Sequence, residues 1–478
     1  MSAYQNKTKE RVIKYIQLSE NIIEKIQNGF LSSGEKLPSL RQFSQQNSIS
    51  LTTAIRCYEH LEELGYVQAV DKSGFYICTA QQKNVNIEFP AFKSEKCSLN
   101  LSKFQKESPI KSAELAPLLT AQLGSEYFPK DMLQRCFSRV FRNNDMNQYS
   151  YGNAKGADHL RGAITHHFSK NGLTLDAEEL VITNGCLDAV AMAIDIVSKP
   201  KDIIVVTSPC YNGLLQLLSL MEREVIEIPS TENGIDLKQL AFIVENNDIA
   251  ACLFTATFQN PTGHSLSAEQ KQWLAEFADR KQLPIIEDDV FSELNHQGIM
   301  PLPIKYWDKS GWVLWCSSVS KTLAPGMRLG WCATGRFTQQ FIKHRTIKTL
   351  SVNQPLQEGL AQFISAGHYA RHIRSVNKQL ATQVIEYTSY FKKYLPASAI
   401  VSSPNGGLVL WIKVPKLSED LFNQRCIDEN VHVKTGSLFS SRAYYTDCFR
   451  VNIGCPIDDN IKKEILLLCN IISSIVEA

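Results

Sequence analysis

The residues best suited to chemistry lie in the segment SSVSKTLAPGMRLGW, residues 317–331. Lys321 follows a hydroxyl-rich strand end, and a tight turn separates it from Arg328, which begins the next strand. A lysine held among partners can lose its proton and form a Schiff base with an aldehyde. Ser318, Ser320 and Arg328 offer donors to a phosphate, and the arginine can bind it through two bonds. A lone Ser-x-x-Lys is more often a surface lysine beside a turn. Residues elsewhere in the sequence must therefore show whether Lys321 has a chemical role.

This segment resembles the cofactor-lysine motif of fold-type I pyridoxal-phosphate enzymes, in particular the class I/II aminotransferases. In IIEDDVFSEL, Asp288 matches the family aspartate that pairs with the pyridine nitrogen and keeps the ring an electron sink. In FQNPTG, Asn260 matches the asparagine that binds the phenolic oxygen. In ITNGCLDAV, Gly185 and Cys186 stand where backbone amides cradle the phosphate at a helix start.

Three further motifs extend the resemblance. Tyr211 in SPCYNG matches the aromatic residue that stacks on the cofactor ring, and Tyr151 in YGNAKGADHLR matches the tyrosine that reaches the neighbouring subunit's phosphate. Arg450 in FRVNIG matches the arginine that binds a substrate α-carboxylate. Six motifs in the family's order, over residues 115–475, are hard to obtain by chance. The resemblance therefore implies pyridoxal 5'-phosphate as the cofactor and Lys321 as its catalytic lysine.

Two positions depart from the family pattern. Phe291 stands where the family has a tyrosine that donates to the phenolic oxygen, so that oxygen keeps Asn260 but loses a donor. This change weakens the case for efficient transamination. The Gly185-Cys186-Leu187 sequence also differs from the commoner Gly-Ser/Ala-Gln, but a loop that acts through backbone amides should still work.

The elements that must position these residues are predicted by the hydrophobic pattern. Short apolar runs alternate with helical segments from about Leu180, which favours a buried, mostly parallel sheet; the runs are 180–183, 203–207, 251–257, 283–289 and 312–318. After about Leu350 the pattern predicts a helical stretch, strands at 407–414 and 448–453, and a last helix. The fold class is thus α/β, with a large aminotransferase-like domain at 111–350 and a small α+β domain at 351–478.

Residues 1–80 predict a separate domain of three helices and a hairpin. An apolar stripe ends at Gly29, a second helix covers about Ser39 to Gln46, and a third has Ser50 as its N-cap and Gly65 just past its end. Two β-rich runs at 66–70 and 75–79 are joined by a turn sequence. This is the layout of a winged helix-turn-helix.

The head resembles the winged helix-turn-helix of GntR-type regulators, through Leu-Pro-Ser-x-Arg, Thr-Thr and Tyr-x-x-Leu-Glu-x-x-Gly. The resemblance implies that Arg41 contacts phosphate or a base edge. It places a second group at the groove-facing start of the recognition helix, namely Ser50, Thr52, Thr53 and Arg56, and puts Lys72 on the wing. Leu51 stands where many relatives carry arginine, which predicts packing against a thymine methyl.

Composition narrows the remaining possibilities. With 50 basic and 48 acidic residues, the net charge of +2 excludes a uniformly basic nucleic-acid coat. The polar N-terminus and the lack of long apolar runs predict neither a secretory signal nor a membrane span. Thirteen scattered cysteines without a CxxC pair predict free thiols of a reducing compartment and no metal site. We therefore expect a cytoplasmic protein, with residues 81–110 as a polar linker between its two parts.

A GntR-type reader ahead of an aminotransferase-like domain resembles the MocR subfamily of bacterial regulators. The resemblance implies a domain-swapped homodimer that binds a double-stranded DNA operator and senses an amino acid or amine effector through aldimine exchange at Lys321. The alternative is a catalytically competent aminotransferase with an accessory DNA-binding domain. A cofactor-free scaffold is disfavoured, since Lys321, Asp288 and Arg328 are all present.

Overall fold

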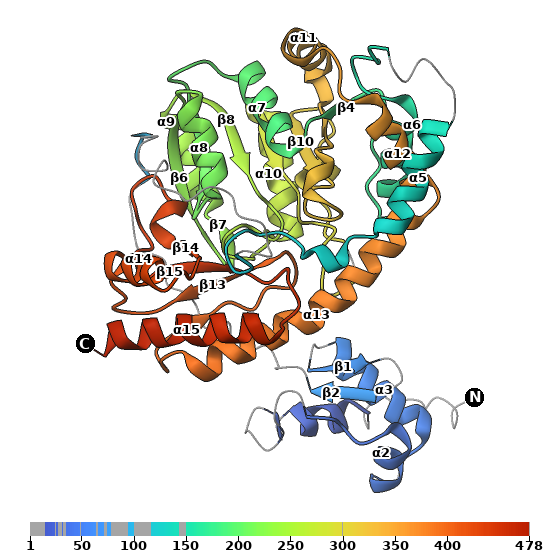
Figure 1. Cartoon of the computed structure of the whole chain (residues 1–478), viewed down its shortest axis with the longest axis vertical. Helices are drawn as coiled ribbons and strands as arrows, with labels where there is room; N and C mark the ends of the chain where they lie inside the picture. The colour runs from blue at the N-terminus through green and yellow to red at the C-terminus, as the bar shows by residue number, and fades with distance from the viewer. Residues whose placement is uncertain are drawn as a thin grey trace, which may run out of the picture. The chain divides into compact units, whose positions relative to one another are not determined.

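The chain divides into two units, Met1–Asn86 and Ile87–Ala478 (Figure 1). The computed structural model describes residues 15–23, 25–26, 31, 35–47, 49–63, 66–70, 74–77, 94–99, 116–142, 150–298 and 300–477. In this part of the chain, no helix combines the length and apolar character needed to cross a membrane.

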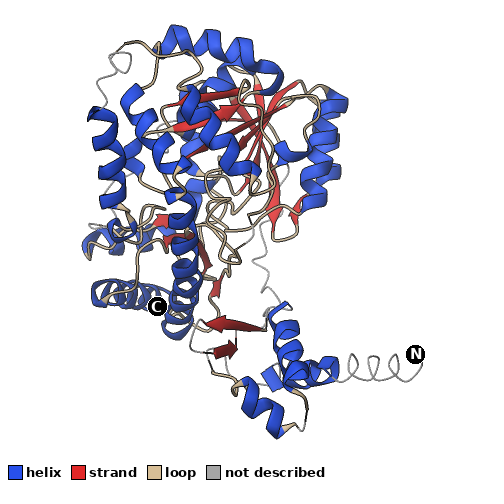
Figure 2. Cartoon of the chain, turned by 90° about the vertical axis from the view of Figure 1, so that its right-hand side faces the viewer, coloured by secondary structure: helices blue, strands red, loops and turns tan. Residues whose placement is uncertain are grey.

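The first unit confirms the predicted three helices and hairpin (Figure 2). Residues 15–23 and 25–26 are helical, and α2 (Leu40–Gln46), α3 (Leu51–Glu63), β1 (Val67–Val70) and β2 (Gly74–Ile77) follow. A capping box between Ser39 and Gln42 starts α2. The inward face of α3 has helical spacing, with Ala54, Cys57, Tyr58 and Leu61 fully buried.

In the second unit, the described residues form a nine-stranded sheet with the order β3-β6-β5-β8-β9-β10-β11-β4 and β7 beside β6. Its strands are β3 (Cys97–Ser98), β4 (Leu180–Thr183), β5 (Ile203–Ser208), β6 (Glu224–Thr231), β7 (Gly234–Ile235), β8 (Ile249–Phe254), β9 (Ile285–Asp288), β10 (Val313–Ser318) and β11 (Gly330–Ala333). Strands β6, β5, β8, β9 and β10 are parallel. Strand β11 is antiparallel to both β10 and β4, so β4 runs with the parallel set.

Helices cover both faces of this sheet because alternate strand residues point to opposite sides. In β8, Ala251 and Leu253 join one core, whereas Cys252 and Phe254 join the other. The first core includes α7 (Cys186–Val197), α8 (Asn212–Leu220) and α11 (Thr338–Thr349). On the other face lie α9 (Leu237–Asn246) and α10 (Ala268–Lys281), and a neighbouring core there joins α5 (Lys130–Arg142), α6 (Asp158–Ser169) and α12 (Gln354–Ser365).

The smaller part of this unit is an antiparallel sheet with the order β12-β13-β15-β14. Its elements are β12 (Ile400–Val401), β13 (Val409–Lys413), α14 (Glu419–Asp428), β14 (Lys434–Thr435), β15 (Cys448–Asn452) and α15 (Asp459–Val476). The long α13 (His368–Tyr394) belongs to both parts (Figure 1). Its Tyr369 and Ile373 pack in the core of the large sheet, and Tyr387 and Phe391 pack in the core of the small one.

Short 3-10 helices complete the described structure, at Ser125–Tyr127, Ile304–Trp307, Pro325–Met327, Gly335–Phe337 and Gly436–Phe439. Within the stretch expected to be a linker, residues 94–99 are attached to the large sheet: Cys97 and Ser98 pair with Val225 and Glu224 of β6. The rest of that stretch, 81–93 and 100–110, lies outside the described residues. The hydrophobic pattern did not reveal this two-residue strand because its pairing partner is far away in sequence.

Candidate functional site

The candidate cofactor residues converge because they follow the carboxyl ends of strands that point the same way. Gly185 comes after β4, Tyr211 after β5, Asn260 after β8, and Lys321 after β10, while Asp288 ends β9. Ligand sites of open α/β sheets lie outside this edge of the sheet. Positions scattered between Gly185 and Lys321 in the sequence thus form one site.

Lys321 is the centre of this site. Its Nζ donates a hydrogen bond to the backbone oxygen of Ala121 at 2.7 Å. Burial lowers the pKa of Lys321 to about 8; the nearby cations Arg450 and Arg328 lower it too, and Asp288 acts in the opposite direction. An amine with this pKa has an appreciable neutral fraction near pH 7, which is the form that attacks an aldehyde.

Asp288 is buried beside the thiol of Cys186, whose Sγ donates to Oδ1 at 3.1 Å. Burial raises the pKa of Asp288 to about 6; the Cys186 bond and the Lys321 charge lower it, and Asp289 adds to the rise. The carboxylate therefore remains largely ionised at neutral pH and can pair with a protonated ring nitrogen. The expectation that Cys186 acts only through its backbone left out this side-chain contact.

The start of α7 fits a phosphate. Gly185 is its N-cap with a φ of 95°, and a Cβ there would lie 2.9 Å from Nη2 of Arg328. Arg328 Nη2 donates to the backbone oxygen of Asn184 at 3.0 Å, which holds a cation beside the helix start. Ser320 Oγ is buried and has no hydrogen-bond partner among the described residues, while Ser318 Oγ accepts from the Ser320 amide at 3.3 Å. This glycine cradle with an unsatisfied hydroxyl and an arginine suits a dianionic group.

Arg450 lies on β15 and is only 2% exposed. Its Nη1 donates to Asn260 Oδ1 at 3.4 Å, and its Nη2 donates to the backbone oxygen of Leu119. The guanidinium carbon lies 5.9 Å from the centre of the Phe439 ring. A planar cation held in this way can bind a carboxylate through two bonds.

Residues 116–124, here called the strap, run across Lys321 and Arg450 and were not identified from the sequence. Asn452 holds the strap at both ends: its amide and side chain donate to the oxygens of Leu118 and Pro117 at 2.8 Å, and its Oδ1 accepts from Gln122 at 3.2 Å. The bonds join residues more than 300 positions apart, so no local pattern could have revealed them. The strap therefore covers the two cationic groups of the site with its backbone oxygens.

Tyr211 and Phe291 occupy different kinds of surroundings. Tyr211 is half-buried at the start of α8, where Gly213 leaves room for its ring: a Cβ on Gly213 would lie 2.6 Å from that ring. Phe291 is buried in an apolar cluster with Phe258, Leu294 and residues of α13. It therefore packs as a core residue and supplies no hydroxyl.

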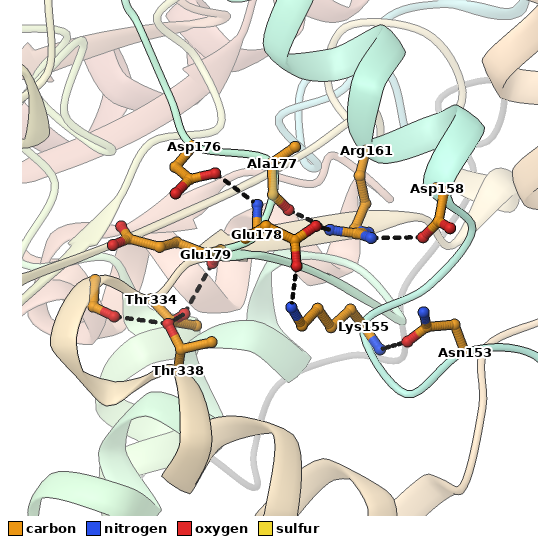
Figure 3. Close-up of polar contacts among 11 residues, drawn as sticks. Asn153, Lys155, Asp158, Arg161, Asp176, Ala177, Glu178, Glu179, Thr334 and Thr338 are labelled. Atoms are coloured by element: carbon orange, nitrogen blue, oxygen red, sulfur yellow. Dashed lines mark hydrogen bonds and ion pairs between the residues drawn. The ribbon is translucent and has the colours of Figure 1, made fainter.

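Tyr151 is 82% exposed, so within one chain it is not buried in the site. Its segment is nevertheless fixed to the sheet by a polar cluster (Figure 3). Lys155 forms an ion pair with Glu178 at 2.6 Å, and Arg161 contacts both Glu178 and Asp158. These bonds from Lys155 and Arg161 lower the pKa of Glu178.

A second polar network begins at Thr322, next to Lys321, and was also not identified from the sequence. Thr322 Oγ1 bonds to the Tyr369 hydroxyl at 2.7 Å, which in turn donates to Glu293 at 2.7 Å, and Glu293 bonds to His167 at 2.6 Å. Burial lowers the pKa of His167, but the charge and hydrogen bond of Glu293 outweigh it, and the net shift is upward. The network anchors the turn that carries Lys321 to α6 and α13.

The head presents a compact set of exposed residues. Arg41 on α2 and Thr52 and Arg56 on α3 are exposed, and so are Leu51 (44%) and Ile55 (36%). Ser50 Oγ accepts from the Thr53 amide at 3.2 Å, which confirms Ser50 as the N-cap of α3.

Thr53 and Lys72 were both expected at the DNA-facing surface of the head. Thr53 is buried, and its hydroxyl bonds to Ser50 at 2.7 Å, so it supports the helix start instead of facing outward. The Thr-Thr pattern did not distinguish the two threonines, because adjacent residues of a helix point in different directions. Lys72 lies outside the described residues. Lys36, exposed and 5.8 Å from the Tyr76 ring, adds a cation beside the hairpin.

Comparison with known proteins gives a family match for each of the two units. The model of the family "Aminotransferase class I and II" matches residues 129–463, and that of "Bacterial regulatory proteins, gntR family" matches residues 14–77. Two relatives from Escherichia coli (strain K12) carry the names "Uncharacterized HTH-type transcriptional regulator" YjiR and YdcR. YjiR is 31% identical over 94% of this chain and 97% of its own length. YdcR is 30% identical over 92% of this chain and 94% of its own length.

A solved structure shares the fold of the second unit. The kynurenine aminotransferase of Pyrococcus horikoshii, determined with PMP, superposes with a TM-score of 0.71 at 24% identity, over 79% of this chain and 94% of that one.

Proposed function

The chain belongs to the family of transcriptional regulators that join a gntR-type head to an aminotransferase class I and II unit, the MocR type, and from this membership we propose that it controls transcription in response to an amino compound. The head is a DNA-binding domain and the second unit binds pyridoxal phosphate. The observation that carries the proposal is the meeting of Lys321, Asp288 and Arg450 in one buried site.

The site residues have separate roles toward the cofactor in this proposal. Bound pyridoxal phosphate supplies an aldehyde that condenses reversibly with primary amines and a ring that withdraws electrons. Lys321 holds the aldehyde end, Asp288 the ring nitrogen and Asn260 the phenolic oxygen, with Tyr211 against the ring. The phosphate is bound by the cradle described above, made of the Gly185 and Cys186 amides, Ser318, Ser320 and Arg328.

An effector that carries both an amine and a carboxylate satisfies this site best. The amine competes with Lys321 for the aldehyde carbon, and Arg450 binds the carboxylate. Arg450 donates to the backbone oxygen of Leu119 in the strap, so a bound carboxylate takes over a bond that the strap makes. Occupation of the site therefore changes the protein's own contacts, which is the requirement for a signal.

The exposed residues of the head are assigned to DNA. Arg41, Thr52 and Arg56 contact phosphates or base edges in the major groove, with Ser50 at the helix start and Lys72 on the wing. Leu51 and Ile55 form an apolar surface on the same helix, suited to thymine methyl groups.

The exposed Tyr151 supports a homodimer. A tyrosine that is 82% exposed on a segment fixed by ion pairs is available to a second chain. We assign it to the phosphate of the partner's cofactor, in a domain-swapped dimer whose two heads read two half-sites.

Transamination is the second candidate activity. Lys321, with its pKa lowered to about 8, can carry a proton to and from a substrate carbon. Phe291 provides no hydroxyl to the phenolic oxygen, so turnover is expected to be slow.

The test compares L-alanine with ethylamine, which lacks the carboxylate. The absorbance of the bound cofactor and the affinity for the protein's own upstream DNA are measured in the parent, in Arg450→Gln and in the control Arg425→Gln, which changes an exposed residue of α14. We expect alanine to act at lower concentration than ethylamine in the parent and the control, and the difference to disappear in Arg450→Gln. A panel of amino acids and amines that changes absorbance but never DNA affinity would contradict a regulatory function and favour the enzyme.

A further inference from the structure

Glu227 on β6 is a buried carboxylate that none of the cofactor assignments uses. It is 5% exposed and accepts hydrogen bonds from Ser208 Oγ at 2.5 Å, Ser440 Oγ at 3.0 Å and the Ser441 amide at 2.5 Å. No described residue forms an ion pair with it. A buried charge is costly unless hydrogen bonds satisfy it, so these donors are held firmly to the carboxylate.

The donors come from two segments that border the site. Ser208 is the last residue of β5, just before the turn that carries Tyr211. Ser440 and Ser441 belong to residues 436–445, here called the coupling loop. The Cys210 amide donates to the oxygen of Phe439 at 2.8 Å, which joins the two segments a second time. Phe439 is the residue whose ring lies 5.9 Å from the Arg450 guanidinium. Glu227 thus joins the end of β5, which precedes Tyr211, to the loop whose Phe439 lies beside Arg450.

The coupling loop also reaches the segment that follows the linker. Arg442 donates its amide to Ser440 Oγ at 3.2 Å. Its guanidinium lies 3.4 Å from Oε2 of Glu95, 3.4 Å from the backbone oxygen of Glu95 and 3.4 Å from that of Lys96. One side chain therefore holds two consecutive residues.

Residues 94–99, here called the exit segment, are the described part of the second unit that comes first after the head in sequence. Strand β6 supports the segment through the β3 pairing and through a bond of 3.1 Å from Ser98 Oγ to Glu224. The same strand carries Glu227 three residues later. A series of contacts thus runs from Arg450, through the ring of Phe439 and the coupling loop, to the exit segment.

We propose that the coupling loop transmits occupation of the site to the exit segment through Arg442, with Glu227 as the positioning residue that holds the loop. The proposal rests on the proposed function and specifies its route. A carboxylate bound at Arg450 shifts Phe439 and its loop, and Arg442 then exchanges its contacts with Glu95 and Lys96. This ion pair is exposed, at 33% and 58%, and such pairs are weak enough to exchange readily.

Hydrogen–deuterium exchange of the full-length protein tests this route without any DNA. Protein loaded with pyridoxal phosphate is compared with protein loaded with N-(5'-phosphopyridoxyl)glycine, a stable adduct that brings a carboxylate to the site. In the parent and in the control Arg425→Gln we expect amide exchange to change at least about threefold in both the coupling loop and the exit segment. In Arg442→Gln the loop should still respond and the exit segment should not.

Two results would overturn the route: an exit segment that responds equally in Arg442→Gln and the parent, or one that stays unchanged in the parent while the loop responds. Arg442 is on the surface, so its loss should leave the fold intact. Glu227→Gln, which keeps one acceptor and removes the charge, should raise exchange of the loop in both loaded states; unchanged exchange would contradict the positioning role. The exchange experiment does not measure DNA affinity. Its result is therefore independent of the test of the regulatory function, which does measure it.

Discussion

The head presents its candidate DNA contacts in solvent on two short helices, whereas the cofactor site gathers buried groups from five strand ends and from β15. In the head, Arg41 and Arg56 contribute little to the core, which Tyr58 and its neighbours form. In the site, Arg450 and Asp288 shift the pKa of Lys321, and each of the three side chains is hydrogen-bonded inside the protein. Binding and stability are therefore separable in the head and coupled in the site.

The largest effect that distinguishes the two regions is expected from removal of Lys321. We expect Lys321→Ala to lose the borohydride-trapped cofactor adduct completely while the protein still binds its DNA, because the head has its own core. Mass spectrometry after reduction measures the adduct. A variant that still traps cofactor at another lysine would show that the assignment is wrong.

The converse change removes the core of the head. Tyr58 is fully buried, donates to the oxygen of Pro38 at 3.0 Å and packs against Phe43 and Phe75. We expect Tyr58→Ala to destabilise the head by about 3–5 kcal/mol, the usual cost of deleting a large buried aromatic ring. Calorimetry should show that the transition of the head is lowered or lost, with the cofactor absorbance unchanged. A parallel loss of cofactor would contradict the independence of the two regions.

A surface change in the head should affect binding alone. Arg41→Ala is expected to weaken operator binding by about 1–3 kcal/mol if Arg41 reads a base, with relaxed specificity at one position. If it contacts phosphate only, affinity should fall on all sequences alike. Gln45→Ala, exposed on the same helix, is the control. Titrations at several salt concentrations separate the two outcomes, and an unchanged affinity would exclude Arg41 from the interface.

In the site, the rate of cofactor capture by Lys321 is expected to depend on pH. The pKa of Lys321 is about 8, so covalent capture of added pyridoxal phosphate by the apoprotein should rise with pH and reach half its maximal rate near pH 8. Arg450→Met removes a cation that lowers this pKa and should move the midpoint upward. Stopped-flow absorbance measures the rate, and a midpoint that stays in place would contradict the contact between the two groups.

The smallest expected effect is that of a helix cap. Ser50→Ala removes the side-chain bond to the Thr53 amide and should destabilise the head by about 1 kcal/mol, as for other N-caps. Chemical denaturation followed by circular dichroism detects such a change. Ser437→Ala changes a serine of the second unit and is the control. It should leave the unfolding transition of the head unchanged.

Features that depend on neighbouring residues were predicted from the sequence. The Ser50 cap, the buried runs of the parallel strands and the residues at their carboxyl ends all follow from hydrophobic spacing or from short motifs. The strand direction then brings Gly185, Asp288 and Lys321 together without further information.

Features that depend on distant pairing were not predicted. The strap is held by Asn452, and β3 pairs with β6 across more than 120 residues. The Cys186 thiol meets Asp288 only because the ends of β4 and β9 face the same space. No periodicity or motif encodes these contacts, since each is settled by tertiary packing.

The strap has a consequence for the kind of ligand that the protein selects. Arg450 already donates to a neutral backbone oxygen of the strap, so a neutral ligand such as an amide only exchanges one equivalent bond for another. An anionic carboxylate replaces a neutral acceptor with a charged one, and charge-assisted bonds are about twice as strong. The strap thus competes with the ligand for Arg450. We expect the presence of an anionic group on an amine to determine whether it binds, more than the size of the amine does.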